Sequence, residues 1–196
     1  NASFHKAYLM RIEGEGVNLR NSVLRDATLT EAKLIKSDLS SVDLRGADLS
    51  RGSFAESAFN GANFRSVEAP AANFSDCDFK GAKLDHANFE RANLSGAMFV
   101  GTRFGDAVLT ESDLSGANLS GAKMGRVIGL TASQLSQACG NEDTVLPAGL
   151  STKACPKPAA LEVAVHMADT AGLEAPAAPR GARQHETGRT RSAGRR

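Results

Sequence analysis

The chain has 196 residues, with 23 Lys and Arg, 22 Asp and Glu, and a formal net charge of +1, which is enough sequence for one domain and a tail. Residues 1–125 carry 14 basic and 16 acidic residues, for −2, and residues 126–196 carry the remaining 9 and 6, for +3. These numbers exclude a strongly acidic rod, and the absence of an apolar run of about 18 residues excludes a membrane segment of helical type.

The chain begins in mid-pattern at Asn1 with no methionine, and no signal peptide is visible. We therefore expect a fragment or a processed chain, from which any N-terminal address is missing. The location stays open between the periplasm or cell exterior and the cytoplasm.

A five-residue pattern holds from residue 4 to residue 124. Of its 25 central positions, 23 are Leu, Phe or Met, and all nine Phe lie on them. The position two places before each central residue never carries a charge, and Asp or Asn is common directly before it. A period of five fits neither a helix nor a strand, so it predicts a repeat architecture, which takes precedence over local propensity.

Residues 47–51 (ADLSR) and 117–121 (ANLSG) match the motif A(D/N)LXX as they stand. This pattern resembles the pentapeptide-repeat family. The resemblance implies an all-β solenoid, namely a right-handed quadrilateral β-helix of about six coils, with four pentapeptides to a coil. We expect the β-helix over residues 1–127, a short α-helical cap over 128–155 and a disordered tail over 156–196.

Stacked coils of 20 residues place equivalent positions in columns, which form the predicted core. Each buried Leu or Phe contributes about 1.5–3 kcal/mol, and Cys77, at the small position, is expected to be buried as a small hydrophobe. The predicted core residues are Phe4, Leu24, Leu44, Phe64, Leu84 and Phe104 in one column, and Phe59, Phe79 and Phe99 in another.

Two central positions, Gly14 and Ala69, are not large and apolar. The terminal coil is expected to loosen at Gly14. Next to Ala69, Pro70 removes a backbone donor, so a bulge or an unpaired corner is expected there. This departure is either a recognition feature or a defect that the fold tolerates.

A cap follows the repeats near Val127. Thr131 with Gln134 three residues later predicts a capping box, and Gly140 predicts the end of the helix. Residues 144–150 (TVLPAGL) predict an extended apolar strap over the same end, because a bare final coil exposes core and unpaired edges. A helix followed by a Leu-Pro strap is similar to the C-termini of bacterial members of the family.

Cys139 and Cys155 lie 16 residues apart and flank this cap. Two alternatives are open: a disulfide that fastens the strap to the helix, as in an exported protein, or two free thiols of a cytosolic protein. From Pro156 onward, a tail rich in Ala, Pro and Arg is expected to be disordered.

No arrangement of residues points to catalysis. His5, His86, His166 and His185 are scattered without ligand spacing, and no nucleophile–base set or phosphate loop occurs. The Asp residues directly before central positions are expected to bond the backbone at corners. The sequence thus predicts a protein that is not an enzyme, with no catalytic residues, no metal site, no cofactor and no small-molecule substrate.

One wall of the predicted solenoid concentrates basic side chains. Like charges stacked at about 4.8 Å repel one another unless nearby carboxylates, here Asp43 and Asp85, offset them. The wall is either a partner-binding basic stripe or a solvated surface with internal ion pairs. The stripe residues are Arg25, Arg45, Arg65, Lys83, Arg103 and Lys123.

The sequence favours a non-enzymatic scaffold for an unidentified protein partner. The alternative comes from the family resemblance, which implies that some members inhibit or protect DNA gyrase by imitating duplex DNA. That mimicry requires a strongly acidic rod, and the nearly neutral repeat region disfavours it. A homodimer is left open.

Overall fold

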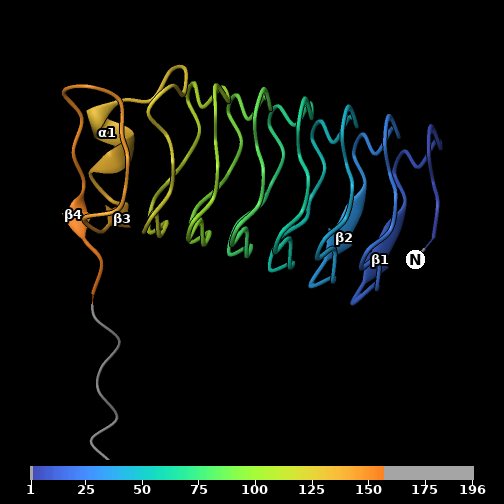
Figure 1. The fold of residues 1–196 in the computed structure, drawn as a ribbon. Helices are drawn as coiled ribbons and strands as arrows, with labels where there is room; N and C mark the ends of the chain where they lie inside the picture. The colour runs from blue at the N-terminus through green and yellow to red at the C-terminus, as the bar shows by residue number, and fades with distance from the viewer. Residues whose placement is uncertain (1, 157–196) are drawn as a thin grey trace, which may run out of the picture. The chain divides into compact units, whose positions relative to one another are not determined.

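The computed structural model describes residues 2–156. Within this range the chain winds into a stack of coils that follow one another along a single axis (Figure 1). Parallel β-bridges join residues that are 20 apart, from Ser3 with Val23 to Val108 with Ile128. One coil therefore takes four pentapeptides, and the predicted repeat register is confirmed.

The regular elements in this range are short. β1 (Glu13–Glu15) pairs in parallel with β2 (Lys33–Ile35), and β3 (Cys139–Gly140) pairs in parallel with β4 (Lys153–Ala154). The single described helix, α1 (Ala132–Leu135), has four residues and follows the last coil. No helix among residues 2–156 has the length and apolarity needed to cross a membrane.

The backbone hydrogen bonds explain the period of five. The N–H groups of Leu49 and Arg51 donate to the next coil at 2.6 and 3.0 Å, and that of Ser53 donates to the previous coil at 2.8 Å. The N–H of Gly52 donates to the carbonyl oxygen of Leu49 in the same coil at 3.0 Å, and this bond closes the corner. Four of the five N–H groups in this pentapeptide are thus paired with backbone, as a solenoid wall requires.

The fifth N–H belongs to the residue directly after the central one, and a side chain bonds it wherever Asp or Asn stands directly before the central residue. The Asp or Asn directly before the central residue accepts it, as Asp48 Oδ1 does from Ser50 at 2.9 Å and Asn73 Oδ1 from Ser75 at 3.0 Å. This confirms the backbone-bonding role predicted for these outward residues.

Pro70 occupies this same following position, so it lacks only the N–H that the backbone ladder does not use. Glu68 remains bridged to the coils on both sides, and the N–H groups of Ala69 and Ala71 donate to the next coil at 2.8 and 2.9 Å. The predicted bulge or unpaired corner is therefore wrong. The predicted loosening at Gly14 is also wrong, because β1 and β2 pair there.

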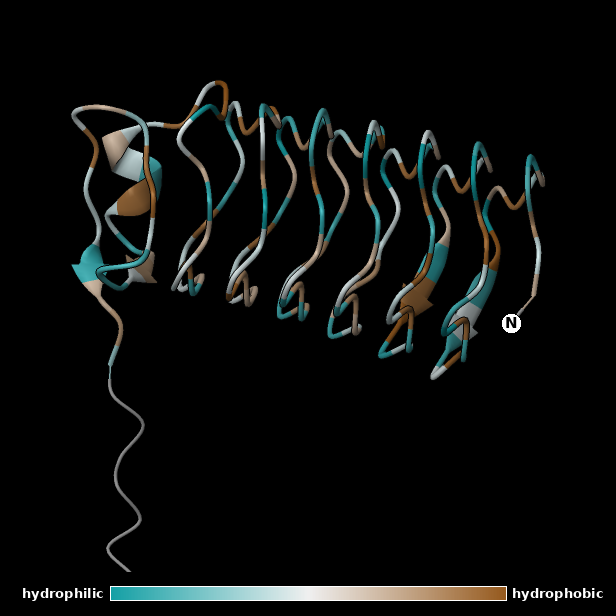
Figure 2. Ribbon diagram, in the orientation of Figure 1, coloured by the Kyte–Doolittle hydropathy of each residue, from teal (hydrophilic) through white to brown (hydrophobic). Residues whose placement is uncertain are grey.

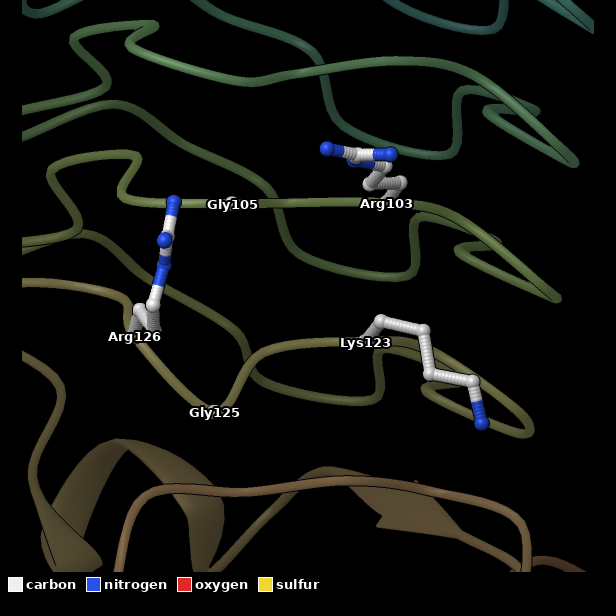
Figure 3. A pocket seen from close by; sticks show the side chains of 5 residues that line it. All are labelled: Arg103, Gly105, Lys123, Gly125 and Arg126. Carbon is white, nitrogen blue, oxygen red and sulfur yellow. The ribbon is translucent and has the colours of Figure 1, made fainter.

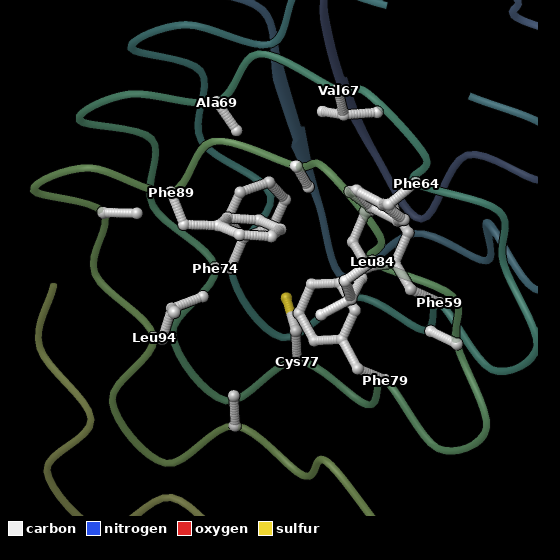
Figure 4. Packing of buried hydrophobic residues seen from close by; sticks show 14 of the residues in the cluster. Phe59, Phe64, Val67, Ala69, Phe74, Cys77, Phe79, Leu84, Phe89 and Leu94 are labelled. Carbon is white, nitrogen blue, oxygen red and sulfur yellow. The ribbon is translucent and has the colours of Figure 1, made fainter. Parts of the chain in front are cut away.

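The core lies inside the coils and is filled by the central column residues. Phe rings meet in the middle of the stack, where Phe59, Phe64 and Phe79 contact one another (Figure 4). Hydrophobic and hydrophilic residues alternate along each coil, so every coil contributes to both core and surface (Figure 2). All nine predicted core residues pack in this cluster, although Phe4, in the first described coil, is only partly buried.

Cys77 is fully buried at its small position, as predicted. Its Sγ points into the core (Figure 4) and lies 2.9 Å from Phe54 O. Burial raises the pKa of the Cys77 thiol to about 12, so this thiol stays protonated and unreactive at neutral pH.

The cap differs from its prediction in one respect. Thr131 and Gln134 form the expected capping box, but the helix ends at Leu135, and Gly140 lies in β3 instead of ending the helix. The reason is that Cys139 re-enters the backbone ladder, with its N–H on Ala117 O at 2.9 Å.

Beyond the helix the chain continues over the last coil. Val145 bridges Lys123, and Leu146 and Leu150 pack against the core, in agreement with the predicted strap. Cys139 and Cys155 form a disulfide with an S–S distance of 2.01 Å. The predicted tail, apart from Pro156, lies outside the described residues.

Candidate functional site

The six predicted stripe residues lie on one wall of the solenoid. Lys83, Arg103 and Lys123 are joined directly to one another as successive partners in a column of β-bridges. Arg25, Arg45 and Arg65 lie one coil apart on the same wall and line a shallow pocket of about 310 Å³. The structure therefore brings the stripe together in two parts, one toward each end of the wall.

In the first part, Asp43 holds two guanidinium groups. Arg25 Nε donates to Asp43 Oδ2 at 2.6 Å, and Arg45 Nη2 donates to the same oxygen at 2.9 Å. The Asp43 side chain is only 19% exposed. The hydrogen bonds from Arg45, reinforced by Arg25, lower the pKa of Asp43 to about 2, although burial opposes the shift.

Asp43→Asn is expected to lower the free energy of unfolding at pH 7 by about 1–2 kcal/mol. The lowered pKa alone corresponds to roughly 2 kcal/mol, reduced because solvent screens the half-exposed arginines. A folded-state pKa below the unfolded value adds stability above about pH 4 that is lost as the pH falls through about 2. Urea unfolding measured from pH 7 to pH 2 should show the difference between wild type and variant shrink.

Asp48→Asn provides the matched control, since Asp48 occupies the same repeat position and among the described residues accepts hydrogen bonds only from Ser50. It should change stability less than Asp43→Asn does. A constant difference between Asp43→Asn and wild type across this pH range would contradict the role given to the arginine pair.

Asp85 connects the two parts, because it pairs with one arginine of each. Arg103 Nε lies 2.8 Å from Asp85 Oδ1, and Arg65 Nε lies 3.4 Å from Asp85 Oδ2. The Asp85 side chain is 6% exposed, so it is a buried anion under two outward cations. Asp43 and Asp85, which the sequence analysis named as the groups that offset the repulsion, therefore pair with four of the six stripe cations.

Besides Lys6 in the first described coil, three cations on the wall make no ion pair with any described residue. Lys83 is one, and Lys123 is another, although its Nζ donates to Asp143 O at 2.9 Å. The third, Arg126, was missed by the stripe prediction. It stands two places after the central residue Met124, a position that the prediction did not read for this wall.

Charge is unevenly distributed around the coil. We counted, for each wall, the residues next to the central position of every coil. The stripe wall then has eight Lys and Arg and four Asp. The opposite wall, which lies ten residues further along each coil, has two Lys and five acidic residues. The basic set is Lys6, Arg25, Arg45, Arg65, Lys83, Arg103, Lys123 and Arg126, with Asp26, Asp43, Asp85 and Asp106. The opposite wall has Lys33 and Lys36 with Glu13, Glu15, Glu56, Asp76 and Asp113.

The remaining candidate chemical groups take surface roles. His86 Nδ1 lies 2.8 Å from Asp106 Oδ2, and His5 Nδ1 lies 3.8 Å from Asp26 Oδ2, both on the exterior. His166 and His185 lie outside the described residues. Among residues 2–156, no group of three or more His, Cys, Asp or Glu side chains is arranged to hold a metal ion.

Comparisons with solved structures return pentapeptide repeat proteins. One from the Arabidopsis thaliana thylakoid lumen is 30% identical over 50% of this chain and 70% of its own, with a TM-score of 0.41. QnrB1, a plasmid-mediated fluoroquinolone resistance protein, is 18% identical over 74% and 88%, with a TM-score of 0.48. HetL from the cyanobacterium Nostoc sp. strain PCC 7120 is 20% identical over 75% and 86%, with a TM-score of 0.27.

No curated protein sequence matches the chain. The family description "Pentapeptide repeats" matches in eight copies, over residues 15–51, 53–85, 72–110 and 87–126, which together make up more than half of the chain. The 20-residue coil and the filled central columns agree with that match. The chain belongs to the pentapeptide repeat family, and its solenoid is a right-handed β-helix.

Proposed function

We propose that this protein is a non-enzymatic scaffold that offers its basic wall to an acidic surface of a partner protein. The observation that carries the proposal is the polarity of the coil, with eight basic and four acidic residues on one wall and an acidic wall opposite. A rigid ladder of backbone bonds fixes these charges in place, so a partner meets a surface that is already ordered.

The ion pairs on this wall do not remove its charge. Asp43 and Asp85 are each shared by two arginines, so each trio keeps a net charge of +1. Lys83, Lys123 and Arg126 add charges that no carboxylate of the described residues neutralises. Fixed positive charge on one wall steers an acidic partner to that wall and orients it.

The same distribution argues for a protein partner over nucleic acid. A nucleic-acid-binding domain is usually strongly basic, whereas residues 1–125 carry a net charge of −2 and present an acidic wall as well. It also differs from the uniformly acidic rod that DNA mimicry toward gyrase requires.

The test compares two triple variants that remove equal charge. Lys83→Gln, Lys123→Gln and Arg126→Gln together alter the basic wall without touching Asp43 or Asp85. The control combines Lys33→Gln, Lys80→Gln and Arg91→Gln on the other walls. Binding of a fluorescent poly-glutamate peptide, followed by anisotropy at increasing salt, should weaken about tenfold in the first variant only, since each lost contact to a charged group has a large effect.

Equal weakening in both triple variants would mean that net charge, and not the wall, attracts the probe. A labelled DNA duplex serves as the second probe in the same titration. Tighter binding of the duplex than of poly-glutamate would replace the protein partner by nucleic acid and overturn the proposal.

A further inference from the structure

The basic wall contains two backbone donors, on adjacent coils, that no group of the described residues accepts. Where Asp or Asn stands directly before the central residue, it accepts the N–H of the residue that follows the central one, for example Asn118 Oδ1 from Ser120 at 3.0 Å. Arg103 and Lys123 occupy that accepting position here, and a cation accepts no hydrogen bond. The N–H groups of Gly105 and Gly125 consequently have no acceptor among the described residues.

These two N–H groups lie on successive coils, about 4.8 Å apart by the spacing of a parallel ladder. Both glycines line a pocket of about 320 Å³, together with Arg103, Lys123 and Arg126 (Figure 3). No carboxylate lines it. A Cβ on Gly105 would approach Asp85 Oδ1 to 2.7 Å, so glycine is required at this side of the pocket floor.

The three cations stand around the pocket with donors to spare. Arg103 uses its Nε on Asp85, which leaves its terminal N–H groups, and Lys123 uses one donor on Asp143 O. Arg126 makes no hydrogen bond or ion pair with any described residue. In Figure 3, Arg103 and Lys123 point away from each other and Arg126 extends toward the coil of Gly105, which leaves the floor uncovered.

Two acidic side chains near the pocket are already paired. Asp85 is held by Arg65 and Arg103, and Asp106 is held by His86 at 2.8 Å. Two unsatisfied backbone donors between three cations form the kind of concavity that binds anions. A tetrahedral oxyanion has enough acceptors to bond two N–H groups and a guanidinium together.

The pocket at the other end of the wall lacks this arrangement, although three arginines line it. There the N–H of Arg45 is accepted by Asp43 Oδ1 at 3.4 Å and that of Arg65 by Asn63 Oδ1 at 3.3 Å. Asp26 also lines that pocket and repels an anion. The N–H of Arg25 there has no acceptor among the described residues, but Asp26 and the shared Asp43 reduce the positive charge of that pocket. The pocket of Gly105 and Gly125, with no carboxylate in its lining, is therefore the better anion site.

We propose that the pocket of Arg103, Gly105, Lys123, Gly125 and Arg126 binds the phosphate group of a phosphomonoester. The group is carried either by a free ion or by a phosphorylated side chain of the partner. The second source rests on the proposed function, because it makes this pocket the anchor point of the partner on the basic wall.

The experiment is a titration of the ¹⁵N-labelled full chain, with the amide resonances of Gly105 and Gly125 as reporters. Inorganic phosphate should shift both resonances saturably. Arg126→Gln should weaken that binding about tenfold, whereas Arg91→Gln, which removes an exposed arginine from another wall, should leave it unchanged. Arg126 holds nothing in place, so its variant is expected to fold normally, which the remaining amide spectrum checks.

Further arms separate the two sources of phosphate. A phosphoserine peptide that binds more tightly than inorganic phosphate, with its unphosphorylated counterpart inactive, identifies a phosphorylated partner; equal affinities identify the free ion. Absence of a saturable shift at both glycines, or equal weakening by Arg126→Gln and Arg91→Gln, overturns the site. If the protein binds phosphate but not poly-glutamate, the proposed function is contradicted and the phosphate site is supported.

Discussion

Phe79→Ala is expected to lower the free energy of unfolding by about 3–5 kcal/mol, the range typical of removing a buried aromatic ring. The Phe79 ring is fully buried between those of Phe59 and Phe99, at centroid distances of 5.2 and 5.1 Å, and meets Phe64 edge-on. The β-ladder fixes the coil spacing, so the neighbouring rings cannot close the cavity. Urea denaturation followed by circular dichroism measures the loss.

Phe4→Ala is the matched control, because Phe4 occupies a central position but is only partly buried. The same change should there lower the free energy of unfolding by only about 1 kcal/mol, in proportion to the smaller buried area. Equal losses at the two sites would show that the Phe column is not the cooperative centre of the solenoid.

Replacing both Cys139 and Cys155 by serine is expected to lower the free energy of unfolding by about 3 kcal/mol. The bond closes a loop with a sequence separation of 16, and a cross-link of this length restricts the unfolded chain by about that amount. The loop contains β3 and the strap that covers the last coil, so loss of the bond also loosens the cover over the end of the core. Chemical denaturation of wild type and variant gives the difference.

A reducing agent supplies the control for the disulfide. Reduction should destabilise the wild type to the level of the double variant and leave the double variant itself unaffected. Cys77 is buried and takes no part in either state. If the wild type were equally stable with and without reductant, the cross-link would not exist in solution.

The repeat made the architecture predictable, because one register fixes which residue faces inward, where each corner lies and which carbonyl each N–H meets. The errors occurred where the prediction counted a residue type without its place in the register. Pro70 was expected to break the ladder, yet it stands at the single position whose N–H the ladder leaves unused. Gly140 was interpreted as the end of a helix, but it belongs to β3, paired with β4.

The candidate site was predictable only in part. Columns 20 residues apart locate the stripe and name Asp43 and Asp85 as its neutralising groups, both of which the ion pairs confirm. Arg126 was not found, since it lies at a corner position after the central residue. The unsatisfied N–H groups of Gly105 and Gly125 follow from the hydrogen-bond pattern, and a sequence does not display that pattern.

The 20-residue coil also determines how this surface can change by insertion or deletion. Losing one whole coil shortens the rod and keeps every later residue on its wall, so both halves of the basic wall stay aligned. Losing a single pentapeptide preserves the core equally well but rotates everything after it by a quarter turn, which carries Arg103 and Lys123 to a different wall from Arg25 and Arg45. Gene rearrangements in multiples of five therefore retain the fold, and only multiples of twenty retain the surface.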